Sequence, residues 1–279
     1  MLSYRHGFHA GNHADVLKHL VQTLVIKYLT RKDTPIRYID THSATGGYEL
    51  DSEFARKTSE WVDGIGRLWK QSACPDHLND YLDIVQTFNN NKTLKLYPGS
   101  PSIAAALLRK QDRLNLFELH PADSRQLARN FKTDRRVKVH TEDGFAGLKS
   151  LLPPLEKRAL VLIDPPYEVK ADYNTVIKSL KEALKRFAVG VFCIWYPRLD
   201  SEHSRMFGNR LESCGAQRWL HITLDVRSSH SGGMFGSGMF VINPPWLLQQ
   251  QLQEVLPWLV ECLGENADAK FTLNSCGLD

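Results

Sequence analysis

The residues with the clearest chemical potential are Asp164-Pro165-Pro166-Tyr167, which directly follow an apolar run at 159–163. A short apolar run ended by prolines predicts a strand buried on both faces of a parallel sheet. Ligands bind beyond the carboxyl ends of such strands. The Asp164 carboxylate and the Pro165 carbonyl are two acceptors that suit the two N–H bonds of a primary amine, and Tyr167 offers a ring face. The run therefore predicts a cleft that holds a heteroaromatic amine.

Polar residues follow two further predicted strands. Residues 36–40 predict a strand that leads into the small-residue loop 41–48, which contains His42 and a Gly-Gly pair. Such a loop is typical of the first turn of a nucleotide-binding sheet, although the G-x-G-x-x-G spacing is missing. Residues 114–119 predict the next strand, with Glu118 near its tip. A carboxylate there can accept from both hydroxyls of a ribose, and a capping role is the plainer alternative.

Two loop positions add to these polar groups. Asp143-Gly144 follows a predicted strand at 137–140 and fits a contact with adenine, because the carboxylate can accept from the amino group. Asp-Gly is also a common turn, so both interpretations stay open. Ser100 stands before Pro101 and predicts the N-cap of a helix whose unpaired N–H groups point at the cleft.

The order of these elements predicts an α/β fold in which strands alternate with helices. Residues 189–197 predict a fifth strand ended by Pro197, and 219–226 and 238–246 predict an antiparallel pair. Residues 50–96 instead carry apolar residues at helical spacing, which predicts an inserted helical subdomain within a main domain formed by 1–49 and 97–279.

The last part of the chain predicts a helix from about residue 247 to 263, followed by a frayed tail. Asn243-Pro244-Pro245-Trp246 resembles the run at 164–167. Its strand comes last in the chain, in the predicted antiparallel pair, so we interpret this second run as structural.

Composition limits the class of protein. The chain has 279 residues, of which 42% are hydrophobic and 24% charged, as in an ordinary globular protein. No run is long and apolar enough for a membrane helix, and five cysteines without a close pair argue against disulfides and structural zinc. These features predict a cytoplasmic protein. The net charge of +4 permits nucleic-acid binding, and basic residues gather at 125–138 and 178–186.

The opening segment 4–15 is rich in histidine, aromatic residues and glycine, and Asn12 predicts the N-cap of a helix that follows. Three interpretations of its histidines remain. A metal site lacks the usual ligand spacing, a disordered tail is the plain alternative, and a lid over a ligand would use the glycines for close backbone approach.

The run at 164–167 matches the signature of methyltransferases that methylate amino groups of adenine or cytosine with S-adenosylmethionine. Together with the residues from Tyr4 to His19 and the helical insert, this signature makes the chain resemble the RlmJ-type family over nearly its full length. Members of that family methylate the 6-amino group of an adenine in 23S ribosomal RNA. We expect RNA as the partner, protein-free or early in assembly, with no membrane or metal, and a monomeric enzyme.

The resemblance implies a class I, Rossmann-like fold with a mostly parallel seven-stranded sheet and helices on both faces. It implies contacts with S-adenosylmethionine at His19, His42, Ser100, Glu118, Asp143, Gly144 and Asp164. It implies an RNA side formed by Tyr4, His6 and Lys18, beside Pro165 and Tyr167 from the motif, with Asp164 as the catalytic residue.

Two alternatives belong to other classes. A DNA adenine or cytosine methyltransferase would use the same four residues, but the sequence shows no separate DNA-reading module such as a helix-turn-helix. A non-catalytic nucleic-acid-binding protein on the same scaffold would have a broken site, whereas Glu118, Asp143 and Asp164 are all present.

Overall fold

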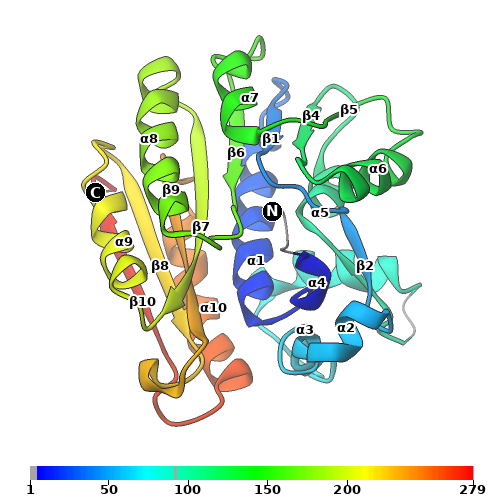
Figure 1. The fold of residues 1–279 in the computed structure, drawn as a ribbon, viewed down its shortest axis with the longest axis vertical. Coiled ribbons are helices and arrows are strands. Elements are labelled where there is room, and N and C mark those ends of the chain that lie inside the picture. The colour runs from blue at the N-terminus through cyan, green and yellow to red at the C-terminus, as the bar shows by residue number, and fades with distance from the viewer. Residues whose placement is uncertain (1–4, 91–92, 279) are drawn as a thin grey trace.

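The structure is a computed structural model that describes residues 5–90 and 93–278 (Figure 1). Its centre is an eight-stranded sheet with the order β10-β8-β9-β7-β6-β1-β4-β5. In chain order these strands are β1 (Arg37–Asp40), β4 (Arg113–Phe117), β5 (Val137–His140), β6 (Ala159–Ile163), β7 (Val191–Leu199), β8 (Trp219–Asp225), β9 (Met234–Ile242) and β10 (Lys270–Cys276). Within the sheet, the five neighbouring strands β7, β6, β1, β4 and β5 pair in parallel. The pairs β7–β9, β9–β8 and β8–β10 are antiparallel. The predicted α/β, mostly parallel class is confirmed.

Helices cover both faces of this sheet, as predicted (Figure 1). One layer contains α1 (His13–Leu29), α4 (Asp76–Phe88), α5 (Ser100–Leu107), α6 (Pro121–Asn130) and α10 (Leu248–Leu263), and the other contains α7 (Gly144–Leu151), α8 (Lys170–Arg186) and α9 (Glu202–Glu212). Their apolar side chains form a hydrophobic cluster on each face of the sheet. Among the described residues, no helix has the length and apolar character needed to cross a membrane.

The prediction of seven strands was wrong, because the expected frayed tail contains β10. This strand pairs antiparallel with β8 from Lys270, opposite Asp225, to Cys276, opposite Trp219. Phe271 and Leu273 are partly buried against the hydrophobic cluster, so alternate residues of the tail face the protein. Burial of that apolar face holds the strand at the sheet edge.

The prediction that Pro197 ends the fifth strand was also wrong. β7 continues through Pro197, which pairs with Ser237 of β9. β6 ends at Ile163, opposite Ile194, so within the described chain the last part of β7 is paired only with β9. A strand paired on one side tolerates a residue without an N–H group.

The stretch between β1 and β4 is largely helical. A two-stranded ribbon of β2 (Gly47–Glu49) and β3 (Leu96–Pro98) brackets α2 (Glu53–Thr58), α3 (Ile65–Trp69) and α4. Buried side chains of α4 such as Tyr81 belong to the same hydrophobic cluster as α1. The division into a domain of 1–49 and 97–279 with an insert at 50–96 stays a prediction.

The register of the parallel strands sets the position of the site. Asp40 ends β1 opposite Leu116 of β4 and Leu162 of β6. The carboxyl ends of these three central strands therefore meet at one edge of the sheet, which is where ligands bind in this class of fold.

Candidate active site

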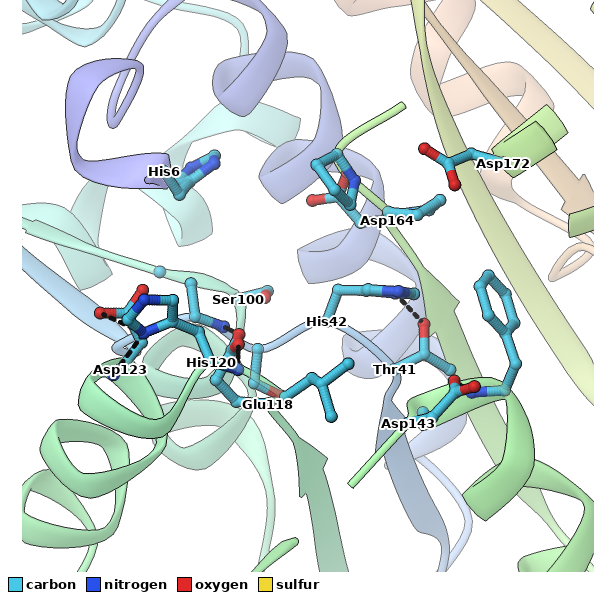
Figure 2. Close-up of a pocket in the computed structure, with 18 of the residues that line it drawn as sticks. His6, Thr41, His42, Ser100, Glu118, His120, Asp123, Asp143, Asp164 and Asp172 are labelled. Atoms are coloured by element: carbon cyan, nitrogen blue, oxygen red, sulfur yellow. Dashed lines mark hydrogen bonds and ion pairs between the residues drawn. The ribbon is translucent and has the colours of Figure 1, made fainter. Parts of the chain in front are cut away.

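A pocket of about 330 Å³ lies at that edge. All residues predicted to contact the cofactor line it, namely His19, His42, Ser100, Glu118, Asp143, Gly144 and Asp164. Figure 2 shows most of these side chains around one space, with Glu118 at one side, Asp143 at another and Asp164 above His42. The structure therefore brings together residues that are separated by up to 145 positions in the sequence, although their contacts with a cofactor stay a prediction.

A second cavity of about 560 Å³ adjoins the first. His6, Lys18, Asp164 and Pro166 line both cavities, whereas Tyr167 lines the second and Pro165 the first. Tyr4 lies outside the described residues. Asp164 thus stands in the wall shared by two adjacent cavities.

The Asp164 carboxylate is held by a buried ammonium group. Lys18 Nζ lies 2.6 Å from Asp164 Oδ2 and 2.8 Å from Asp15 Oδ1. The Lys18 side chain is only 4% exposed, and although burial opposes its charge, the two carboxylates raise the pKa of Lys18 above its ordinary value. Among the described residues, Asp164 Oδ1 has no hydrogen-bond partner, which leaves this oxygen available to a ligand.

The backbone and packing of the motif fix Tyr167. Its φ of 51° lies in the left-handed region, which is uncommon for an aromatic residue. Its hydroxyl donates to the Trp195 carbonyl at 2.7 Å, and its ring contacts the rings of Tyr173 and Phe207. The side chain is 7% exposed, and burial raises its pKa, so the hydroxyl stays protonated. Tyr167 therefore presents a fixed, neutral ring to the second cavity.

Glu118 is held by two backbone N–H groups beyond the end of β4. Its Oε2 accepts from Ala44 N at 2.8 Å and its Oε1 accepts from His120 N at 2.6 Å. Burial raises the pKa of Glu118, and these two contacts oppose the rise. Each oxygen retains a lone pair that can accept from a ribose hydroxyl.

The two interpretations of Asp143-Gly144 prove compatible. Asp143 is the N-cap of α7, and its Oδ1 accepts from Phe145 N at 2.8 Å. Among the described residues, Oδ2 has no partner, which leaves it available to an adenine amino group. At Gly144 a Cβ atom would lie 2.1 Å from the Thr41 carbonyl oxygen, so only glycine lets this loop approach the loop after β1.

The prediction of Ser100 as an N-cap was wrong, because Gly99 is the cap and Ser100 is the first residue of α5. The Ser100 hydroxyl instead donates to Asp40 Oδ2 at 2.7 Å, and Tyr38 donates to the same oxygen. Asp40 is fully buried, and burial raises its pKa to about 6. Sequence reasoning missed this carboxylate, although its place at the end of β1 was a signal.

Two buried histidines complete the wall of the first pocket. His19 Nδ1 lies 2.7 Å from the Tyr97 hydroxyl, while Nε2 is buried without a hydrogen-bond partner among the described residues. Burial lowers the pKa of His19 to about 3 and that of His42 to about 4, so both rings are neutral at pH 7. The unpartnered His19 nitrogen and the Glu118 carboxylate fit S-adenosylmethionine, which carries an amino acid end and a ribose diol.

The described part of the opening segment lies against these cavities. His6 Nε2 is 3.0 Å from Asp15 Oδ2, and His9 Nδ1 is 2.9 Å from Glu60 Oε1 in the helical stretch. Arg5 forms an ion pair with Asp123 of α6, across the first pocket from α1. This placement supports the lid among the three interpretations of the segment. In the described chain, no group of three or more His, Cys, Asp or Glu side chains is arranged to hold a metal ion.

The Asn-Pro-Pro-Trp run at 243–246 has structural contacts, as expected. Asn243 Nδ2 donates to the carbonyls of Ala188 and Gly190, both at 2.8 Å, beside the start of β7. Because β9 runs antiparallel to β7, this run lies beside the amino end of β7, whereas Asp164 lies at the carboxyl ends of the parallel strands.

This fold and this site define a class I, S-adenosylmethionine-dependent methyltransferase. A sequence model of the family described as "Ribosomal RNA large subunit methyltransferase D, RlmJ" matches residues 33–274. Ribosomal RNA large subunit methyltransferase J of Escherichia coli is 50% identical over 260 residues, which cover 93% of each chain. The protein of the same name from Haemophilus influenzae is 47% identical over 275 residues, or 98% of each chain.

A crystal structure of a Legionella pneumophila protein superposes with a TM-score of 0.90 at 35% identity, covering 96% of this chain and 99% of the other. The chain therefore belongs to the RlmJ family of ribosomal RNA large subunit methyltransferases. The family assignment confirms the resemblance, the class of enzyme and S-adenosylmethionine as the cofactor.

Proposed function

We propose that this enzyme transfers a methyl group from S-adenosylmethionine to the 6-amino group of one adenine in 23S ribosomal RNA. The observation that carries the proposal is the place of Asp164 in the wall between two adjoining cavities. The first cavity has the acidic and neutral groups that suit the cofactor, and the second has a fixed aromatic ring at Tyr167.

The target adenine flips out of the RNA and enters the second cavity beside Tyr167. Asp164 Oδ1 and the Pro165 carbonyl accept the two hydrogens of its amine. Oδ1 is the available oxygen of Asp164, since Oδ2 is already bound by Lys18. These contacts direct the nitrogen lone pair toward the first cavity. S-adenosylmethionine bound there would supply the methyl group, and its sulfur would be the leaving group that keeps the electrons of the broken S–C bond. As the new N–C bond forms, the amine loses a proton, which leaves through Asp164 or to water. Positioning supplies most of the rate gain.

The lining of the first pocket supports the proposed cofactor contacts. Glu118 binds the ribose, Asp143 and Gly144 bind the adenine of the cofactor, and His19 meets its amino acid end. His42 and Ser100 complete the wall. His6 and Lys18 form the side toward the RNA, together with Tyr4, Pro165 and Tyr167. Protein-free or early-assembly RNA as the substrate, a monomeric state, a cytoplasmic location and independence of metal stay predictions.

The test is the variant Asp164→Ala. We expect it to lose methyl transfer by at least about a thousandfold, since the acceptor for the amine and its positioning are removed together. Its fold should persist, because Lys18 keeps Asp15 as a partner at 2.8 Å. The assay counts methyl groups transferred to protein-free 23S RNA, and circular dichroism and cofactor titration serve as controls. Full activity in this variant would refute the mechanism.

The substrate is tested with the same preparation. Methylation is measured on protein-free ribosomal RNA, on assembled large subunits and on DNA. Mapping of the modified nucleotide by mass spectrometry then identifies the base. Methylated cytosine, or methyl transfer to DNA alone, would favour the alternative class of enzyme, and cofactor binding without transfer to any substrate would favour the non-catalytic alternative.

A further inference from the structure

The first turn of α1 contains a buried carboxylate, Asp15, that the mechanism above does not use. It is 1% exposed. Its Oδ1 accepts from Lys18 Nζ at 2.8 Å, and its Oδ2 accepts from Gly11 N at 2.8 Å. The same Oδ2 lies 3.0 Å from His6 Nε2. One carboxylate therefore contacts the lysine that binds Asp164 and two residues of the opening segment.

The shared ammonium group explains why this contact matters. Lys18 has a flexible stem and three N–H donors. With Asp15 on one side and Asp164 on the other, its Nζ has a fixed place between two oxygens, 2.8 Å and 2.6 Å away. Without Asp15, the whole charge of Lys18 would face Asp164. The ammonium group could then move across to Oδ1, the oxygen that the amine needs.

We propose that Asp15 is a positioning residue for methyl transfer: it keeps Lys18 on Oδ2 of Asp164, so that Oδ1 stays directed at the target amine. The same carboxylate holds His6 at the wall that both cavities share. This inference rests on the proposed function, in which Asp164 accepts hydrogens of the amine.

A purely structural role is the alternative, since a carboxylate in the first turn of a helix stabilises its N-terminus. The chain offers a matched control for that role. Asp112 is 0% exposed. Its Oδ1 accepts from Ile36 N at 2.9 Å, and the same oxygen lies 3.0 Å from a guanidinium nitrogen of Arg109. It lies just before β4, at the amino ends of the parallel strands, whereas the pocket lies at their carboxyl ends. Asp112→Asn thus removes a buried, paired charge without touching the site.

The first experiment compares Asp15→Asn with Asp112→Asn. Asparagine keeps the shape of Asp15 and an acceptor for Gly11 N, and it removes the charge. We expect the kcat of Asp15→Asn to fall by about 10- to 100-fold, with the cofactor Kd within about threefold of the wild type. Asp112→Asn should keep the wild-type kcat per folded molecule. A wild-type kcat in Asp15→Asn, or equal losses in both variants, would overturn the proposal.

The second experiment is a double-mutant cycle with Lys18→Met. If Asp15 acts through Lys18, the double variant Asp15→Asn/Lys18→Met should be no slower than Lys18→Met alone. Independent effects, in which the two rate losses multiply, would show that Asp15 acts elsewhere and would refute this role. Wild-type enzyme in the same assay separates the outcomes: if it methylates no RNA, the proposed function fails, whereas an active wild type with an unaffected Asp15→Asn refutes only this inference.

Discussion

Replacing Lys18 by methionine should destabilise the protein in a way that depends on pH. Burial by itself raises the pKa of Asp15, but His6 and Lys18 hold it well below its ordinary value. Lys18→Met removes the cation that lies between Asp15 and Asp164 and keeps a side chain of similar length. The two carboxylates would then repel each other in a site where one of them is 1% exposed.

The magnitude follows from the geometry. With Nζ at 2.6 and 2.8 Å from the two oxygens, carboxylates on either side of it at roughly 5 Å repel by about 3 kcal/mol at an effective dielectric constant of ~20. Breaking a buried pair costs about 3–5 kcal/mol in general. We therefore expect Lys18→Met to lose about 3–5 kcal/mol of unfolding free energy at pH 8.

The sign of the pH dependence is set by Asp15. In the wild type its low folded-state pKa contributes stability above the unfolded pKa, and that contribution is lost as the pH falls through the folded value. In Lys18→Met we expect the folded pKa to rise above the unfolded one, so that protonation now favours the folded state. The variant should therefore lose less stability at pH 5 than at pH 8.

Urea unfolding of both proteins at pH 5 and pH 8 measures the effect. The control is Lys27→Met on the same helix, where Nζ lies 2.7 Å from Asp80 Oδ1 with both side chains more than 40% exposed. An exposed pair of this kind contributes about 0–1 kcal/mol. Adding Asp15→Asn to Lys18→Met should restore stability, because it removes the repulsion. Equal losses at both pH values, or a loss no larger than that of Lys27→Met, would refute the reasoning.

Two further predictions concern carboxylates at the carboxyl ends of β1 and β4. Glu118→Gln should weaken S-adenosylmethionine binding about tenfold or more, because an amide offers one acceptor oxygen where the carboxylate offers two; an unchanged Kd in calorimetry would contradict the ribose contact. Asp40 has a pKa raised by burial to about 6, so its charge opposes folding above that pH and its proton favours folding below it. Asp40→Asn should therefore gain up to about 3 kcal/mol relative to the wild type at pH 8 and about half of that at pH 5, and urea midpoints that show no such difference would contradict this sign.

The sequence predicted the strands that carry the site because each is short and rich in apolar residues, and because prolines follow β6. β5 begins and ends at the predicted residues, 137 and 140. β6 ends before Asp164 as expected. Asn12 caps α1 through its side chain, which accepts from Ala14 N and Asp15 N. These are local signals, which depend on neighbours within a few positions.

One error is local, since Gly99 and not Ser100 caps α5. The other differences concern interactions between distant parts of the chain. Pro197 continues a strand because β6 ends early, and β10 forms because β8 offers it an edge. Lys18 was expected on the RNA side, and its role there stays a prediction, but its ammonium group is buried against Asp164, 146 positions away. Helical spacing places Lys18 on α1 and cannot show which carboxylate from another strand it meets.

The wall that the two cavities share, which includes Asp164, Lys18 and His6, separates residues that line only one cavity from residues that line only the other. Glu118 and Asp143 line only the first cavity, and Tyr167 lines only the second. Changes at Glu118 or Asp143 should therefore alter the Kd of the cofactor, and changes at Tyr167 the KM for RNA. Asp164, Lys18 and His6 line both cavities, and Asp15 contacts the last two. Because these four residues form one network of charged and hydrogen-bonding groups, their loss should reduce the rate of transfer more than the affinity for either ligand.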